Sequence, residues 1–259
     1  MNENGTSRWG ATDKILASIL DVGEMMLVSG AEVSRVEDTI HRMASAYGCE
    51  RVDVFTITSS IVVTVLAPGG EIVTQTRRIS GYVTDMLRID RCNALSRQVC
   101  REPLPLEQLR QAVEEIGAKR RYRTCVQCLA YLLVASTFAV FFGGNWQDAL
   151  AAGICALPLY FLLRFFRRLH FQRLVVSLLS AAATGLMAAV LTKVGIGANM
   201  DMICMGNVML LIPGISFTVS LRDMISGDTI SGLLGLCEAV LQSIAIAAGF
   251  AVVMWLVGG

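Results

Sequence analysis

The sequence predicts an α-helical membrane protein: an N-terminal soluble α+β domain, residues 1–123, followed by a bundle of five transmembrane helices, residues 124–259. Charge distribution is the first observation behind this prediction. Residues 1–123 hold 16 of the 22 Lys and Arg and 16 of the 21 Asp and Glu. The other 136 residues hold six basic and five acidic side chains. Hydrocarbon demands such sparse charge, because each Asp, Lys or Arg at the centre of a span opposes insertion by about 2.5–3.5 kcal/mol.

Helices and strands are both predicted in the soluble half. Helical patterns cover Thr12–Val28 and Ala31–Tyr47, and two more cover Leu87–Arg101 and Pro105–Arg120. Between these pairs lie the runs RVDVFTITSS, IVVTVLAPGG and EIVTQTRRI, which are rich in Val, Ile and Thr. Together with the turn signal PGG, they predict three strands with at least one hairpin. Because this half is charge-balanced, it gives no electrostatic argument for binding nucleic acid.

Apolar runs in the second half form the second observation. A helix needs about 20 residues to cross a bilayer, at a rise of about 1.5 Å per residue. Small residues at four-residue spacing, such as Ala181, Gly185 and Ala189, permit close helix packing and favour an oligomer. The predicted spans are Thr124–Phe142, Gln147–Leu163, Leu174–Thr192, Met202–Leu221 and Thr229–Leu256.

Basic loops predict the orientation. KRRYR (Lys119–Arg123) precedes the first span, and RFFRRLHFQR (Arg164–Arg173) joins the second to the third. By the positive-inside rule both loops are cytoplasmic. No cleavable signal is visible, because the first apolar patch is broken by Asp21 and Glu24. We expect a multi-pass protein of the bacterial inner membrane, with its N-terminus in the cytoplasm and its C-terminus outside.

Eight cysteines are scattered along the chain, several of them inside predicted spans. This is no disulfide framework and fits free thiols. Cys125 and Cys128 form a CxxC, but no second pair or histidine flanks it. Two small helix-packing residues are the preferred interpretation, against a redox or metal site. We therefore predict neither a metal nor a cofactor.

Two long stretches carry a family resemblance. SGAEVSRVEDTIHRMASAYGCERVDVFTITSSIVVTV and PGISFTVSLRDMISGDTISG together resemble the threonine/serine exporter family. The resemblance extends through DMLRIDRCNALSRQV and the five spans, so it covers the chain from about Asp13 onward.

The resemblance implies a transporter made of two parts. Members of the family occur as one long chain with about ten spans or as two subunits with five spans each. This chain resembles the larger subunit of the split form, which implies a second five-span membrane subunit as partner. The split bacterial pair is associated with succinate export and the single-chain members with threonine and serine export. The residues do not choose between these solutes, which share a carboxylate.

A helix break is predicted inside the fourth span. Pro213 and Gly214 lie about 11 residues into it, near mid-bilayer at about 1.5 Å per residue. Proline removes an N–H group and clashes with the preceding turn, while glycine frees the backbone. Broken helices are common at transporter substrate sites, although a simple proline kink is the alternative.

Charged groups flank the last two spans. Arg222 matches a carboxylate in bidentate geometry, so it is a candidate for solute contact; the alternatives are an ion pair with Asp223 or Asp228 and contact with the lipid headgroups. The two aspartates are proton-path candidates, but in a solvated loop they would stay ionised. Glu238 lies about nine residues into the fifth span, with Gln242 one turn later. An acid at membrane depth should face the bundle or a partner, unless it lies at the cytoplasmic interface.

The soluble domain carries the motif SGAEVSRVED, with Ser29, Gly30, Glu32, Arg35 and Glu37 as candidate functional residues. A salt bridge from Glu32 to Arg35 at i,i+3 is the preferred interpretation. A serine hydrolase built on Ser29 and His41 is less favoured, because no GxSxG motif is present.

Three hypotheses follow. The leading one is a non-enzymatic exporter subunit for a small carboxylate-bearing solute, driven by the proton gradient. The second is a membrane-anchored cytosolic sensor or hydrolase-like enzyme that uses the SGAEVSRVED region. The third is a structural assembly factor, in which neutralising Arg222, Asp223 or Glu238 has no effect on transport.

Overall fold

The computed structural model describes residues 4–79, 81–118, 122–169 and 171–258, and its chain forms two compact units. The α+β unit comprises Met1–Arg120 and Ile215–Leu236, and the helical unit comprises Arg121–Gly214 and Cys237–Gly259. The sequence predicted one boundary near residue 123. Ile215–Leu236, which the sequence analysis placed in the membrane domain, has most of its contacts within the α+β unit. Residues 119–121 of the first basic loop and 170 of the second lie outside the described residues.

The α+β unit contains the helices and strands that the sequence predicted, within a few residues except at the start of α1. Its three strands form one antiparallel sheet in the order β1-β2-β3. The elements of its N-terminal part are α1 (Asn4–Val28), α2 (Val33–Ala46), β1 (Arg51–Ile57), β2 (Ser60–Leu66), β3 (Ile72–Arg78), α3 (Met86–Arg101) and α4 (Leu106–Ala118). Most of α9 (Gly214–Ser226) and the start of α10 (Thr229–Gly258) also belong to this unit.

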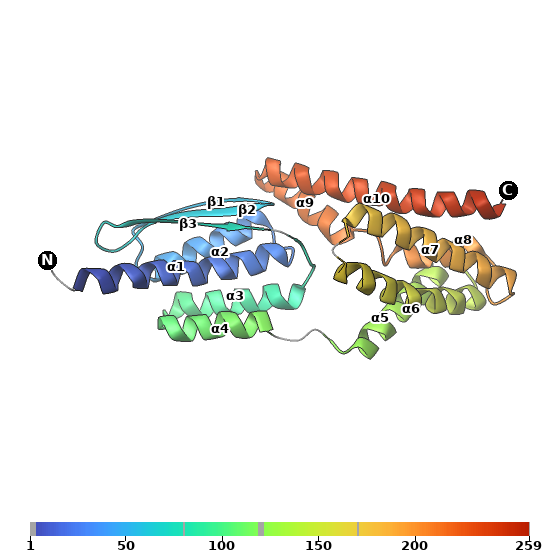
Figure 1. Ribbon diagram of the computed structural model, residues 1–259, viewed down its shortest axis with the longest axis horizontal. Coiled ribbons are helices and arrows are strands. Elements are labelled where there is room, and N and C mark those ends of the chain that lie inside the picture. Colours follow the sequence, from blue (N-terminus) through green and yellow to red (C-terminus); the bar gives the residue numbers. More distant parts are fainter. Residues whose placement is uncertain (1–3, 80, 119–121, 170, 259) are drawn as a thin grey trace. The chain divides into compact units, whose positions relative to one another are not determined.

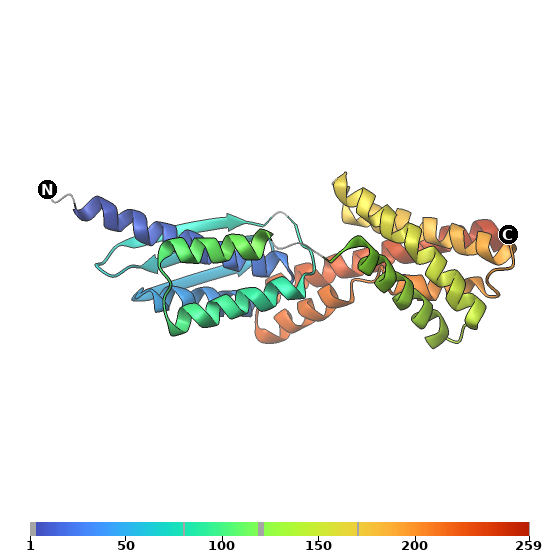
Figure 2. The ribbon, with the colours of Figure 1, turned by 90° about the horizontal axis from the view of Figure 1, so that it is seen from below.

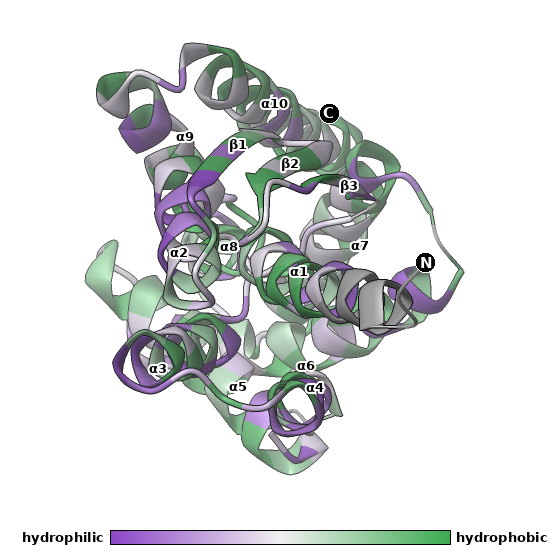
Figure 3. Ribbon diagram, turned by 90° about the vertical axis from the view of Figure 1, so that its left-hand side faces the viewer, coloured by the Kyte–Doolittle hydropathy of each residue, from purple (hydrophilic) through white to green (hydrophobic). Residues whose placement is uncertain are grey.

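The core of the α+β unit lies between its layers of helices and strands. The sheet covers α1 and α2, and α3 and α4 lie on the opposite side of that helix pair (Figures 1 and 2). Val33, Val36, Ile40 and Met43 recur at three- and four-residue spacing, so they form one buried stripe of α2. The alternating residues of β2 point into the same core. In Figure 3, purple and green alternate around α3 and α4, as expected of helices with one solvated face.

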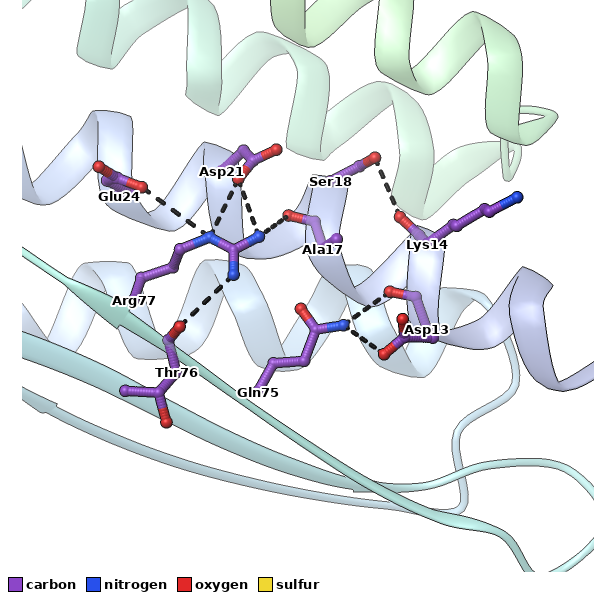
Figure 4. Close-up of polar contacts among 9 residues, drawn as sticks. All are labelled: Asp13, Lys14, Ala17, Ser18, Asp21, Glu24, Gln75, Thr76 and Arg77. Carbon is purple, nitrogen blue, oxygen red and sulfur yellow. Dashed lines mark hydrogen bonds and ion pairs between the residues drawn. The ribbon is translucent and has the colours of Figure 1, made fainter.

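Polar contacts tie β3 to α1 at the edge of the sheet (Figure 4). Arg77 lies 3.2 Å from the Asp21 carboxylate, and its Nε lies 4.0 Å from Glu24. Gln75 donates hydrogen bonds to the backbone and side-chain oxygens of Asp13. These contacts help fix the register of the sheet edge against α1. Burial raises the pKa of Glu24 above its ordinary value, with Asp21 adding to the rise and Arg77 opposing it.

Among the described residues, four helices are long and apolar enough to cross a membrane: α5 (Thr124–Phe141), α6 (Trp146–Arg168), α7 (Arg173–Lys193) and α10, over Thr229–Val257. They correspond to four of the five predicted spans. The predicted fourth span, Met202–Leu221, is not one helix. It is divided into α8 (Met200–Val208) and α9, so the count of five spanning helices is not confirmed. Proline and glycine at the division account for the difference.

Small residues dominate the core of the helical unit. Ala135, Ala139, Ala151, Ala152 and Ala156 are all fully buried. Such side chains let helix backbones approach closely, which is the main means of association in lipid.

Candidate functional site

The division of the predicted fourth span lies at residues 209–213, where the chain leaves the α-helical conformation. α8 ends at Val208, and α9 begins at Gly214 immediately after Pro213. Gln242 of α10 is half-buried, and its Nε2 donates to the carbonyl oxygen of Leu211 at 3.5 Å. Three predicted site residues, Pro213, Gly214 and Gln242, therefore belong to one feature of the helical unit.

Glu238 and Gln242 differ in their surroundings although one helical turn separates them. Glu238 is exposed on α10. It does not face the interior of this chain's own bundle, which was one of the predicted environments. Leu236, two residues earlier, is the last residue that packs with the α+β unit. Placement at the interface or against a partner remains a prediction.

Asn207, which the sequence analysis missed, is the most buried polar residue at this feature. It lies in the last turn of α8 and is 0% exposed. Its Nδ2 donates to the carbonyl oxygens of Ala152, at 3.2 Å, and Ile203, at 3.0 Å. Its Oδ1 is buried and has no hydrogen-bond partner among the described residues. One asparagine in an apolar run forms no pattern that sequence inspection could have found.

Asp148, also missed, organises one end of the helical unit. It is 0% exposed and closes a capping box with Asn145 at the start of α6. Its Oδ1 also accepts the backbone N–H groups of Ala198 and Asn199 at 2.8 and 2.7 Å. The NWQD spacing of a capping box was an available signal. The carboxylate thus fixes the loop that leads into α8.

The two motifs of the family resemblance meet in the α+β unit. Arg222 Nη1 lies 2.8 Å from Glu32 Oε1, and Asp223 Oδ1 accepts the backbone N–H of Val33 at 3.2 Å. The predicted pairing of Glu32 with Arg35 is wrong, and the ion pair considered as one alternative for Arg222 forms with Glu32 rather than with Asp223 or Asp228. Residues 190 positions apart in the chain supply the partners instead. Arg35 is exposed on the surface of α2.

Asp223 is not in a solvated loop, as the sequence analysis expected. It is 6% exposed. Burial raises the pKa of this carboxyl from 3.8 to about 6, and the nearby carboxylates Asp228 and Glu32 add to the rise. The Val33 hydrogen bond and Arg222 oppose it. Its position at the N-terminus of α2 favours the ionised form, but burial outweighs that effect.

Glu37 extends this acidic region toward the sheet. Its Oε1 accepts the backbone N–H of Thr56 at 2.7 Å. Burial raises its pKa, with Asp228 contributing to the rise and the Thr56 contact opposing it. Asp228 therefore acts on both Glu37 and Asp223, while Arg222 pairs with Glu32 and opposes the rise at Asp223.

Ser29 and Gly30 form the turn between α1 and α2. Gly30 has a φ of 91°, a left-handed conformation that glycine adopts without strain. Ser29 is 1% exposed, and its carbonyl oxygen accepts the N–H of Asp85. His41 lies exposed on α2. A buried hydroxyl and an exposed imidazole do not form the accessible pair that a hydrolase requires.

In the described part of the chain, no group of three or more His, Cys, Asp or Glu side chains is placed to hold a metal ion. Cys125 is exposed and Cys128 half-buried, both at the start of α5.

These features define a multi-pass membrane protein in which one helix is interrupted, an arrangement found in transporters of small solutes. The family model for threonine/serine exporters matches residues 17–257. The chain belongs to the threonine/serine exporter family.

Two proteins named as threonine/serine exporters are similar to the chain. A threonine/serine exporter of Corynebacterium glutamicum is 22% identical over 236 residues, which are 88% of this chain and 48% of that protein. A protein named "probable threonine/serine exporter" from Mycobacterium tuberculosis (strain ATCC 25618 / H37Rv) is 23% identical over 245 residues, 92% of this chain and 45% of that protein. The chain thus spans about half the length of these relatives. No solved structure matches it.

Proposed function

We propose that the chain is a subunit of an inner-membrane exporter that moves a small carboxylate-bearing solute out of the cytoplasm. The observation that carries this proposal is the family match, which extends over both units. The relatives are named as threonine/serine exporters. A succinate-like dicarboxylate is the other candidate solute that the resemblance of the motifs suggests.

The membrane topology in this proposal has five crossings. α8 has nine residues and is about 13 Å long, less than half of a hydrocarbon core of about 30 Å. The turn at residues 209–213 and the beginning of α9 would complete the crossing. Non-helical backbone is tolerated at membrane depth only inside protein or beside a water-filled cavity, which favours a solute path here. The basic loops and the N-terminus are cytoplasmic, and the C-terminus is outside.

Coupling to the proton gradient is the second part of the proposal. Asp223 has a pKa raised to about 6, so a modest change in its surroundings brings its titration to neutral pH. Its carboxylate also contacts the start of α2, so protonation weakens a contact between α9 and the SGAEVSRVED motif. Asp228 and Glu238 are the other acids proposed for proton transfer.

A second membrane subunit completes the exporter. Half of the relatives' length has no counterpart in this chain. Phe217, Leu221 and Ile225 lie four residues apart on α9 and are 41%, 39% and 86% exposed. An apolar stripe that continues past the proposed crossing to Ile225 fits a protein partner.

Efflux from cells tests the proposal. Cells that express the chain with or without a five-span subunit of the same family are preloaded with labelled threonine, serine and succinate. We expect one solute to leave the cells only when both subunits are present. Asp223→Asn and Glu238→Gln should reduce efflux, whereas Asp201→Asn, which alters an exposed acid on α8, should not.

Each part of the proposal has its own contradicting result. Efflux of none of the three solutes would contradict the exporter proposal, and efflux by this chain alone would contradict the two-subunit part. Unchanged efflux in both acid variants would contradict the proton path and support a structural role for these residues.

A further inference from the structure

The Oδ1 atom of Asn207 is the least satisfied polar atom of the interrupted segment. Asparagine offers two donor hydrogens on nitrogen and one acceptor oxygen. The nitrogen donates to the carbonyl oxygens of Ala152 and Ile203. Because both neighbours are acceptors, the opposite amide orientation would place oxygen against oxygen. The amide orientation is therefore fixed by its neighbours.

Burial makes this free acceptor unfavourable in the molecule alone. Asn207 is 0% exposed, and a polar group buried in an apolar environment without a hydrogen bond is costly. Buried polar atoms nearly always have a partner, so an exception at the interruption of a membrane helix needs an explanation. Gln242, the side-chain amide of the same feature, donates to Leu211 instead. Within the described residues, no donor reaches Asn207 Oδ1.

The position of Asn207 in its helix determines which charge on a bound group is favoured beside Oδ1. Asn207 is in the last turn of α8, where the peptide dipoles leave partial negative charge. Beyond it the chain turns through residues 209–213 before α9 begins. In interrupted membrane helices, C-terminal ends and unwound carbonyls attract cations, whereas helix N-terminal ends attract anions. An amide oxygen at a helix C-terminus therefore selects a positively charged hydrogen-bond donor.

We propose that Asn207, at the end of α8, is a specificity-determining residue that accepts a hydrogen bond from the ammonium group of the transported solute. The inference rests on the proposed export function and deepens it. An ammonium group supplies both the missing donor and the positive charge. Succinate carries no such group, so this site selects an amino acid over a dicarboxylate.

Binding measurements test the site directly. The full chain and its five-span partner are placed in lipid nanodiscs, and equilibrium binding of L-threonine, 3-hydroxybutyrate and succinate is measured. 3-Hydroxybutyrate keeps the carboxylate and hydroxyl of threonine but lacks the ammonium group. A hydrogen bond between a neutral and a charged group changes affinity by roughly tenfold or more. We expect threonine to bind at least that much more tightly than either other compound.

Variants locate the effect. Asn207→Leu and the smaller Asn207→Ser should reduce threonine affinity toward that of 3-hydroxybutyrate, whose own affinity should change little. Thr184→Val is the matched control: Thr184 is a buried polar residue of the same unit, but its hydroxyl already donates to the Ser180 carbonyl oxygen at 2.7 Å. This control should bind threonine as the unchanged protein does.

Several results would overturn the inference. Equal binding of threonine and 3-hydroxybutyrate is one such result, and binding of neither compound is another. Unchanged discrimination in both Asn207 variants is the third, and it would indicate a structural water at Oδ1. Sodium-dependent binding in which Asn207→Leu removes only the sodium requirement would assign the site to that ion. The wild-type comparison keeps the inference open to contradiction even if the variants fail to fold, because equal binding of threonine and 3-hydroxybutyrate excludes an ammonium contact. Discrimination through Asn207 in a protein that exports nothing would contradict only the proposed function.

Discussion

The two units differ in what fills their interiors. Leu20, Met26, Ile40 and Met43 form the interior of the α+β unit. Ala, Gly, Cys and Ser lie between the helices of the helical unit, and large apolar residues such as Leu186 and Ile244 are exposed on its surface. In water, burial of apolar area drives folding, whereas in lipid close packing and hydrogen bonds must do so. A large apolar side chain therefore stabilises the α+β unit by being buried, whereas in the helical unit it lies on the outer surface and small side chains fill the interior.

Truncation of a large core residue gives the largest expected difference between the units. Ile40→Ala in the α+β unit should destabilise the chain by about 2–5 kcal/mol, because it removes buried methyl groups and leaves a cavity. Ile244→Ala, on the exposed face of α10, should change stability by no more than about 0.5 kcal/mol. Thermal unfolding of the full chain in nanodiscs measures both. Equal losses of stability in the two variants would contradict this difference between the units.

Enlargement of a small buried residue should destabilise the helical unit. A Cβ on Gly249 would lie 2.8 Å from Ala181 Cβ, so Gly249→Ala should force α7 and α10 apart and cost about 1–3 kcal/mol. Ala247→Val, on an exposed position of α10, is the control and should be tolerated. The same unfolding measurement applies. A harmless Gly249→Ala would mean that these helices are not closely packed.

Titration of Asp223 gives a smaller effect, specific to the α+β unit. Its folded-state pKa is raised, so its contribution to stability is complete below pH 3.8 and is lost as the pH rises through about 6. Asp223→Asn keeps an acceptor for the Val33 N–H but cannot ionise. Above pH 6 this variant should therefore be more stable than the unchanged protein, by about 1–2 kcal/mol. Denaturation curves between pH 4 and 8 test this, and parallel curves would refute it.

The smallest expected effect belongs to the ion pair between Arg222 and Glu32. The Arg222 side chain is 67% exposed, so solvent screens the charge. A double-mutant cycle with Arg222→Met and Glu32→Gln should give a coupling energy of no more than about 1 kcal/mol. A much larger coupling would show that the pair is shielded from water, for example by the proposed partner subunit.

Local patterns predicted the fold better than the site. Alternating Val and Thr residues and helical periodicity were sufficient for β1–β3 and for α1–α7, because these patterns reflect local geometry. They could not reveal that residues 215–236 pack on the α+β unit, since apolar composition does not identify the packing partner. The pairing of Arg222 with Glu32 joins distant segments, and Asn207 matters only because its neighbours leave one atom unsatisfied. Pro213, whose effect on the backbone is local, was correctly predicted to interrupt the helix.

Gradient-driven transport in proteoliposomes tests the central claim most directly, namely that this family member couples solute movement to protons. The chain and the proposed five-span partner are reconstituted, and the solute identified by cell efflux is followed under an imposed pH gradient. We expect transport that follows the gradient, collapses with a protonophore and is weakened in Asp223→Asn but not in Asp201→Asn. Transport at the same rate with and without the gradient would contradict it.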